Sequence, residues 1–193
     1  MKTIGDFAAI AIERAYYVNA LKRVASVDSL TGLYNRRSFQ RFLDREIARA
    51  KRSGRRFTFM MLDIDQFKQV NDRYGHAAGD QMLLEFSEVL ETVLRKADII
   101  CRYGGDEFIV IMPEVSLDEA KMAKMRIVGA LNERNQSARF VIETSVGLHE
   151  SDGVDTEDIV AFVDVNLYDD KSRRLERRVY SVDENIEDLL ETE

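Results

Sequence analysis

Arg102-Tyr103-Gly104-Gly105-Asp106-Glu107-Phe108 joins two apolar runs of strand length, 98–101 and 108–112. A Gly-Gly pair tolerates the positive φ angles of a tight two-residue turn, so this stretch predicts a β-hairpin. A turn requires no acids at its tip, and the adjacent carboxylates of Asp106 and Glu107 repel each other. The two acids therefore indicate a bound cation.

A second strand end carries acids upstream of the hairpin. Phe57–Ile64 is an apolar run of strand length that ends with Asp63 and Asp65. We expect these two side chains to point to opposite faces, so that at most one of them faces the hairpin acids. Asp63, Asp106 and Glu107 would then bind one or two Mg²⁺ ions, which prefer carboxylate and phosphate oxygens. Such ions support in-line attack at phosphorus. Solvated acids at strand ends are the open alternative.

Residues suited to a nucleotide follow the first acidic strand. Gln66-Phe67-Lys68 opens a short helix, whose first N–H groups and Lys68 would hold terminal phosphates. Asn71 and Asp80 supply an amide and a carboxylate, which suit the donors and acceptors of guanine. From spacing alone, turn and helix-cap roles for Asn71 and Asp80 also remain open.

Helical and strand patterns alternate along the rest of the chain. Residues 28–35 read as a turn-rich joint, and Ser116 with Glu119 predicts a capping box. Asp80 is the expected N-cap of a helix over 81–95. We expect helices over 36–52, 81–95, 116–132 and 156–173, and strands over 57–64, 98–101, 108–112, 140–149 and 178–182. These elements predict an α/β (α+β) fold with a central mixed, mainly antiparallel five-stranded sheet flanked by helices.

The N-terminal segment precedes this fold. Residues 4–25 carry apolar or small side chains three and four apart, the a/d spacing of a coiled coil. An amphipathic helix packed on its own domain fits the same spacing. Residues 4–13 also resemble the last helix of GAF sensory domains. We expect a signalling helix over 1–27, the main domain over 28–182 and an acidic tail over 183–193.

Composition limits the partners and the compartment. The formal net charge of −7 argues against nonspecific binding of nucleic acid. Cys101 is the single cysteine, which excludes an intrachain disulfide and favours a reducing compartment. No apolar run approaches the roughly 20 residues of a membrane span, and no signal-peptide pattern opens the chain. We therefore expect a cytoplasmic protein with no membrane segment in this chain.

Four motifs in order carry a family resemblance. They are Asp28–Arg37, Leu62–Asp72, Gly75–Asp80 and Arg102–Phe108, within residues 28–180. Together they resemble the GGDEF-domain diguanylate cyclases. The resemblance implies a fold similar to the palm of nucleotide cyclases and polymerases, and an enzyme that joins two GTP molecules into cyclic di-GMP with release of two pyrophosphates. Since each such domain binds one GTP, it also implies a homodimer.

The resemblance also implies roles for single residues. Two Mg²⁺ (or Mn²⁺) ions per active site would be bound by Asp63, the Ile64 carbonyl, Asp106 and Glu107. Asp106 and Glu107 would be catalytic, with Glu107 assisting the metal or deprotonating the attacking 3′-hydroxyl. Substrate contacts are implied for Phe67, Lys68, Asn71, Asp80 and Lys171.

Arg95-Lys96-Ala97-Asp98 matches the family's Arg-x-x-Asp site for inhibition by the product. Arginine suits this role because its planar fork binds phosphate and guanine edges in a bidentate way. Arg126 and, from a neighbouring domain, Arg49 are implied further contributors. A surface ion pair between Arg95 and Asp98 is the alternative.

The C-terminal motif departs from the family pattern Ala-Asp-x-Ala-Leu-Tyr-x-Ala-Lys. Lys171 is kept, but Asp170 replaces an alanine, and Asp169 adds a second negative charge. Leu175 stands where a second phosphate-binding cation is expected. These changes predict weaker GTP binding. They leave open a catalytically weak or inactive domain that binds cyclic di-GMP as a signalling module, and an enzyme that makes a different cyclic dinucleotide.

Overall fold

The computed structural model describes residues 26–152, 167–168 and 170–172. Residues 1–25 of the expected N-terminal helix, the strand over 178–182 and the acidic tail lie outside these residues, and so do Asp169 and Leu175. Ser26 and Val27, the last residues of that expected helix, are described and are not helical. In chain order the described elements are β1 (Tyr34–Asn35), α2 (Arg36–Ser53), β2 (Phe57–Ile64), α3 (Phe67–Tyr74), α4 (His76–Val93), β3 (Ile99–Arg102), β4 (Glu107–Pro113), α5 (Leu117–Asn135) and β5 (Thr144–Ser151).

The predicted sheet is confirmed. Its strand order is β1-β3-β4-β2-β5. β1 runs parallel to β3, and every other neighbouring pair is antiparallel. Among the described residues, the strand beyond β3 is Tyr34–Asn35, in the segment expected to be a turn. Two residues are too few to show an alternating pattern, which explains why the sequence did not reveal this strand.

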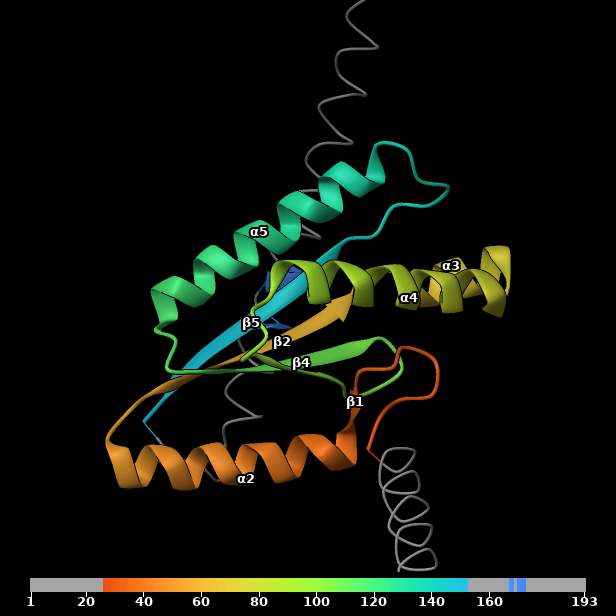
Figure 1. Cartoon of the computed structure of the whole chain (residues 1–193). Coiled ribbons are helices and arrows are strands. Elements are labelled where there is room, and N and C mark those ends of the chain that lie inside the picture. The colour runs from red at the N-terminus through yellow and green to blue at the C-terminus, as the bar shows by residue number, and fades with distance from the viewer. Residues whose placement is uncertain (1–25, 153–166, 169, 173–193) are drawn as a thin grey trace, which may run out of the picture.

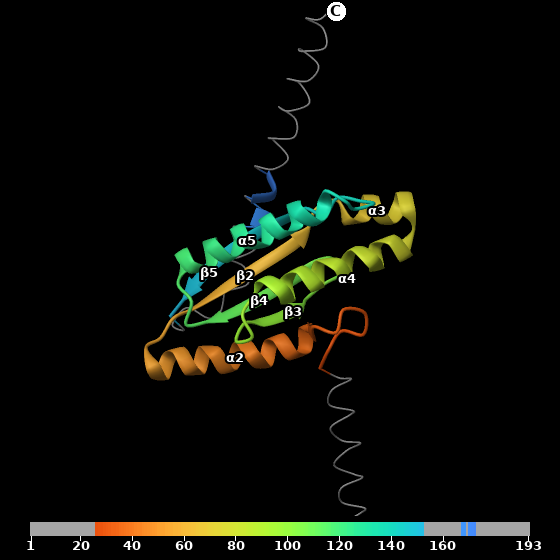
Figure 2. The same cartoon turned by 45° about the horizontal axis from the view of Figure 1, so that its top comes forward.

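Helices cover both faces of the sheet. Figures 1 and 2 show α4 and α5 on one side and α2 on the other. Met60 and Leu62 pack with α4 and α5, whereas Phe59 and Met61 pack with α2, because side chains alternate along a strand. The central strand β2 is therefore apolar on both sides. Because β2 is buried on both sides, its packing in the core determines the position of Asp63 near its end.

Two elements begin four or more residues away from their predicted start. α4 begins at His76 rather than at residue 81, so Asp80 lies inside the helix and does not cap it. The cap is Gly75, whose φ of 84° permits the sharp break after α3. β5 begins at Thr144, four residues later than expected. The predicted capping box of Ser116 and Glu119 is confirmed at the start of α5.

The β3–β4 hairpin is confirmed, but its turn is not a tight two-residue one. Tyr103–Asp106 lie between the strands, and neither Gly104 nor Gly105 has a positive φ. The N–H groups of Tyr103 and Gly104 both donate to the carbonyl of Glu107, at 2.8 and 3.2 Å. A Cβ at position 104 would overlap the carboxylate of Glu107. Gly104 therefore makes room for an acid and supplies no unusual backbone angle.

Candidate active site

Asp63 and Asp106 lie at neighbouring strand ends. β2 and β4 pair with Asp63 opposite Glu107. The carbonyl of Asp106, the last residue of the turn, accepts the N–H of Ile64 at 3.1 Å. The pairing register and this hydrogen bond thus bring Asp63, Ile64 and Asp106, three of the residues predicted for the metal site, side by side.

The two carboxylates interact electrostatically. Burial, and then the nearby charge of Asp63, raises the pKa of Asp106 above its ordinary value. The positive charge of Lys171 opposes this rise in the pKa of Asp106. Lys171 lies close by, since its Nζ donates to Asp63 Oδ1 at 2.7 Å. Burial lowers the pKa of Lys171, but the hydrogen bond to Asp63 and the surrounding carboxylates outweigh it and raise that pKa. The strand ends thus form a site that favours positive charge.

The expectation that Asp63 and Asp65 point to opposite faces is wrong. Residues two apart along a strand share a face, and the charge of Asp65 contributes to the raised pKa of Lys171. Asp65 also accepts the hydroxyl of Ser145 at 2.7 Å, and Ser145 stands opposite Asp63 on β5. Asp65 therefore belongs to the surroundings of the same lysine.

A divalent cation fits this donor set in part. The carboxylates of Asp63 and Asp106 and the carbonyl of Ile64 are hard oxygen donors, the type that Mg²⁺ prefers. The Glu107 carboxylate approaches Gly104 closely. Over residues 26–152, 167–168 and 170–172, no three His, Cys, Asp or Glu side chains stand close enough together to hold a metal ion. Among the described residues, two carboxylates and a carbonyl are the donors that lie together at the strand ends.

The residues predicted to contact the nucleotide lie on α3 and α4. Phe67 opens α3 and packs against the core, and the neighbouring Lys68 is exposed. The side chain of Asn71 lies against Gly79 of α4, where a Cβ would overlap the amide oxygen. The exposed Asp80 follows Gly79 directly. The packing of α3 on α4 thus brings Asn71 next to the turn of helix that carries Asp80.

Arg95 and Asp98 lie at the connection between α4 and β3. The backbone N–H of Arg95 donates to Asp98 Oδ2 at 2.9 Å. Burial raises the pKa of Asp98, and the positive charges of Arg95 and of Arg126 on α5 oppose that rise. These three residues of the predicted inhibitory site are therefore near one another.

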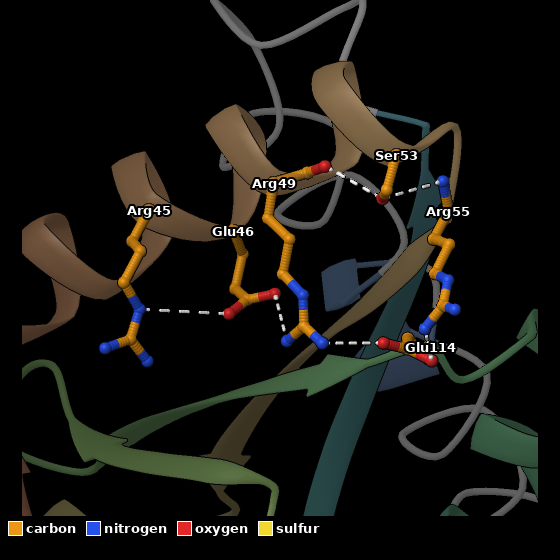
Figure 3. Close-up of polar contacts among 6 residues, drawn as sticks. All are labelled: Arg45, Glu46, Arg49, Ser53, Arg55 and Glu114. Atoms are coloured by element: carbon orange, nitrogen blue, oxygen red, sulfur yellow. Dashed lines mark hydrogen bonds and ion pairs between the residues drawn. The ribbon is translucent and has the colours of Figure 1, made fainter.

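Arg49 belongs to a charged cluster on α2. It donates to Glu114 at 2.7 Å and lies 3.7 Å from the buried Glu46, as Figure 3 shows. Arg55 holds the other oxygen of Glu114 at 2.6 Å. Arg49 also lines a groove of about 590 Å³ together with Arg95 and other residues of α2, β3 and β4. Arg49 and Arg95 thus share a groove within one chain, whereas Arg49 was expected to act from a neighbouring domain.

Arg102 is a site residue that the sequence reasoning missed. Its guanidinium donates to the carbonyl of Gly105 at 2.7 Å and to Asp28 at 3.0 Å, and its side chain is 15% exposed. The turn that carries Asp106 is thereby tied to the joint at Asp28. The available signal was the arginine directly before the Gly-Gly pair and the aspartate that opens the first motif.

Replacing Asp28 by asparagine is expected to lower stability in a pH-dependent way. Burial disfavours its charge, but hydrogen bonds from Thr31 and Arg102 outweigh burial and hold the pKa of Asp28 below its ordinary value. A lowered pKa stabilises the fold above the unfolded value of about 3.9. We expect a loss of about 1 kcal/mol at pH 7 that shrinks as the pH falls below about 4. Urea unfolding across this range measures it, and a pH-independent difference would contradict it.

Comparison with known proteins decides the family. The family model described as "Diguanylate cyclase, GGDEF domain" matches residues 25–177. The chain belongs to the GGDEF family. This GGDEF chain is 36% identical over 149 residues to the diguanylate cyclase DgcS of Shewanella oneidensis, covering 77% of this chain and 50% of the relative. It is 33% identical over 157 residues to the cyclic di-GMP phosphodiesterase NbdA of Pseudomonas aeruginosa, covering 79% of this chain and 20% of that protein.

A solved structure agrees with this assignment. The coiled coil and GGDEF domain of DgcB from Caulobacter crescentus, in complex with c-di-GMP, aligns with a TM-score of 0.82 and 29% identity. The alignment covers 88% of this chain and 92% of that one. The GGDEF chain spans half or less of the length of the two relatives above. In the part that the structure describes, no helix is long and apolar enough to cross a membrane.

Proposed function

We propose that this GGDEF domain is a diguanylate cyclase that condenses two GTP molecules into cyclic di-GMP and two pyrophosphates. The observation that carries the proposal is the pair of carboxylates, Asp63 and Asp106, at adjoining strand ends with Lys171 bonded to Asp63. Carboxylates suit divalent cations, and a neighbouring lysine suits phosphate groups.

The chain's own groups would divide the work as follows. Asp63, Asp106 and the Ile64 carbonyl would bind Mg²⁺ or Mn²⁺, two per site with help from Glu107. When bound, these ions supply Lewis-acid stabilisation of the charge at the α-phosphate. Glu107 would accept the proton of the attacking 3′-hydroxyl. Lys171 would leave Asp63 for the triphosphate, where Lys68 and the backbone at Phe67 contribute further donors.

The geometry of the reaction requires a second copy of the chain. A domain that binds one GTP presents one 3′-hydroxyl and one α-phosphate, so the attack must cross between two domains that face each other. Pairing of residues 1–27 in a coiled coil would raise the effective concentration of the second domain. The rate per domain should therefore rise with protein concentration.

Incubation of the purified chain with GTP and Mg²⁺ tests the activity. We expect cyclic di-GMP and pyrophosphate, measured by chromatography, with a rate per domain that rises with protein concentration. A mixture of ATP and GTP tests the base preference, and only the guanine product is expected. Absence of any cyclic dinucleotide at high protein concentration would overturn the proposal.

A binding module is the second candidate. The groove that contains Arg49 and Arg95 beside Asp98 favours it, because arginine forks bind phosphate and guanine edges. In an active enzyme the same groove, with Arg126, would bind the product and inhibit. Calorimetry with cyclic di-GMP separates the two: binding by a chain that makes no product identifies a signalling module, and inhibition of a chain that does make it identifies a regulated enzyme.

Replacing Gly79 by alanine is expected to weaken GTP binding without loss of stability. Alanine within a helix is favoured over glycine by about 0.5–1 kcal/mol. The new Cβ would displace the amide of Asn71, which is proposed to contact guanine. We expect an unchanged or higher melting temperature together with a KM for GTP raised about tenfold.

Gly129→Ala is the matched control, because a Cβ at this position on α5 meets nothing within 4 Å. It should change neither KM nor the rate. An unaltered KM in Gly79→Ala would contradict the guanine contact proposed for Asn71.

A further inference from the structure

Asp170 stands where the family pattern has alanine, and its surroundings give it a specific partner. Its Oδ1 accepts Nζ of Lys124 at 2.7 Å, and its Oδ2 accepts the N–H of Val146 at 2.9 Å. The two side chains are only 25% and 23% exposed. The negative charge expected to disturb the triphosphate is therefore paired with a lysine of α5.

The contact lies at the open side of β5. Within the described residues, β5 is the last strand on its side of the sheet. In an antiparallel strand, the N–H and C=O of one residue point to the same side. Asp170 takes the N–H of Val146, and Lys124 donates to its C=O at 3.3 Å. The ion pair thus occupies both backbone groups that Val146 would otherwise offer to a further strand.

The helical residues 167–168 and 170–172 lie near β5, because Asp170 accepts the N–H of Val146. Leu167 is buried in the core on the α2 side of the sheet. Asp170, three residues later, contacts Lys124 of α5 on the opposite side. The next residue is Lys171, which reaches Asp63 on β2 at 2.7 Å. The direction of Lys171 thus depends on where its neighbour is held.

We infer that Asp170 is a positioning residue, which together with Lys124 and Val146 anchors the helical segment so that Lys171 points at Asp63 and at the phosphates of the substrate. The inference rests on the proposed function in assigning the phosphates to Lys171. Asp170 in place of alanine would then hold Lys171 in position in a chain that has Leu175 where a second phosphate-binding cation is expected.

A double-mutant cycle tests whether Asp170 acts through Lys171. Binding of guanosine 5′-(α,β-methylene)triphosphate with Mg²⁺ is measured by calorimetry, because this analogue cannot release pyrophosphate. Asp170→Ala and Lys171→Ala are each expected to weaken binding about tenfold. The double variant should bind no more weakly than Lys171→Ala alone. Additive losses would overturn the inference.

Amide exchange of Val146, followed by NMR, reads the anchor independently of the nucleotide. Exchange should accelerate in Asp170→Ala and stay slow in Lys171→Ala, because the N–H loses its acceptor only in the first. Unchanged exchange in Asp170→Ala would overturn the anchor. If Asp170→Ala fails to fold, Asp170→Asn replaces it, since asparagine still accepts the N–H but loses the ion pair, and a smaller weakening of analogue binding is expected.

Lys121→Ala is the matched control. Lys121 lies three residues from Lys124 on α5 and pairs with the exposed Asp118 at the same 2.7 Å. It should change neither Val146 exchange nor analogue binding. If the unaltered chain binds the analogue and Asp170→Ala binds it equally well, the inference alone fails. If the unaltered chain does not bind it, the proposed function fails and the inference with it.

Discussion

Replacing Asp106 by asparagine is expected to abolish cyclic di-GMP formation while leaving the fold as stable as before, or more stable. The substitution keeps the shape of the side chain but removes one of the carboxylates proposed to hold the metal. A loss of about a thousandfold or more in rate is expected for such a group. The rate of product formation and the melting temperature measure the two effects.

The sign of the stability effect follows from the electrostatics. Burial and the charge of Asp63 raise the pKa of Asp106, so its ionised form is less favourable in the folded chain than in the unfolded one. Neutralising the group near pH 7 therefore removes a destabilising charge. Loss of both activity and stability would indicate a structural role for Asp106 instead.

Asp44→Asn serves as the control for this charge change. Asp44 is exposed on α2 and accepts a hydrogen bond from Gln40 at 3.0 Å, away from the strand ends. Its replacement should change neither rate nor melting temperature. Retention of more than about a tenth of the rate in Asp106→Asn would contradict the proposed metal ligand.

The second large effect is expected in the core. Phe108 is fully buried on β4, and its ring meets the ring of Phe86 on α4 edge to face with 4.9 Å between the centroids. Phe108→Ala should lower the free energy of unfolding by about 3–5 kcal/mol, because a cavity is left between sheet and helix. That loss is a large part of the total stability of a typical domain. Urea unfolding followed by circular dichroism measures it.

Met122→Ala provides the comparison at the surface. Met122 is 57% exposed on α5, so its truncation should change the free energy of unfolding by less than about 0.5 kcal/mol. A loss under about 1 kcal/mol in Phe108→Ala would show that the aromatic contact contributes little. Since Phe108 follows Asp106 by two positions, Phe108→Ala should also reduce the rate of product formation.

The sequence predicted those parts of the fold that depend on local pattern. β2 was bounded correctly because its buried run is continuous from Phe57 to Leu62 and resumes at Ile64, and the capping box located α5. The predicted start of α4 was wrong because Asp80 suits an N-cap, whereas Gly75 caps the helix and Gly79 within it allows the close approach of Asn71. In the same way Gly104 resembled a turn residue and serves Glu107.

The candidate site was predictable as a set of residues and not as a set of contacts. The motifs identified the acids at the two strand ends. No spacing in the chain indicates that Arg102 reaches Asp28, or that Lys124 balances Asp170, because these partners are 74 and 46 residues apart. Long-range pairs of this kind follow from the sheet order and the wrapping of the chain.

The sequence separation of the contacts around Asp63 also affects when the candidate site can form during synthesis. Asp63 is synthesised before both of its partners: the threonine hydroxyl that bonds its carbonyl comes 81 residues later, and the lysine that contacts its carboxylate 108 residues later. Contacts of high sequence separation form slowly, since long loops must close first. A nascent or truncated chain that stops before Lys171 therefore lacks one of the contacts around Asp63. The candidate site can form only after Lys171 has been synthesised.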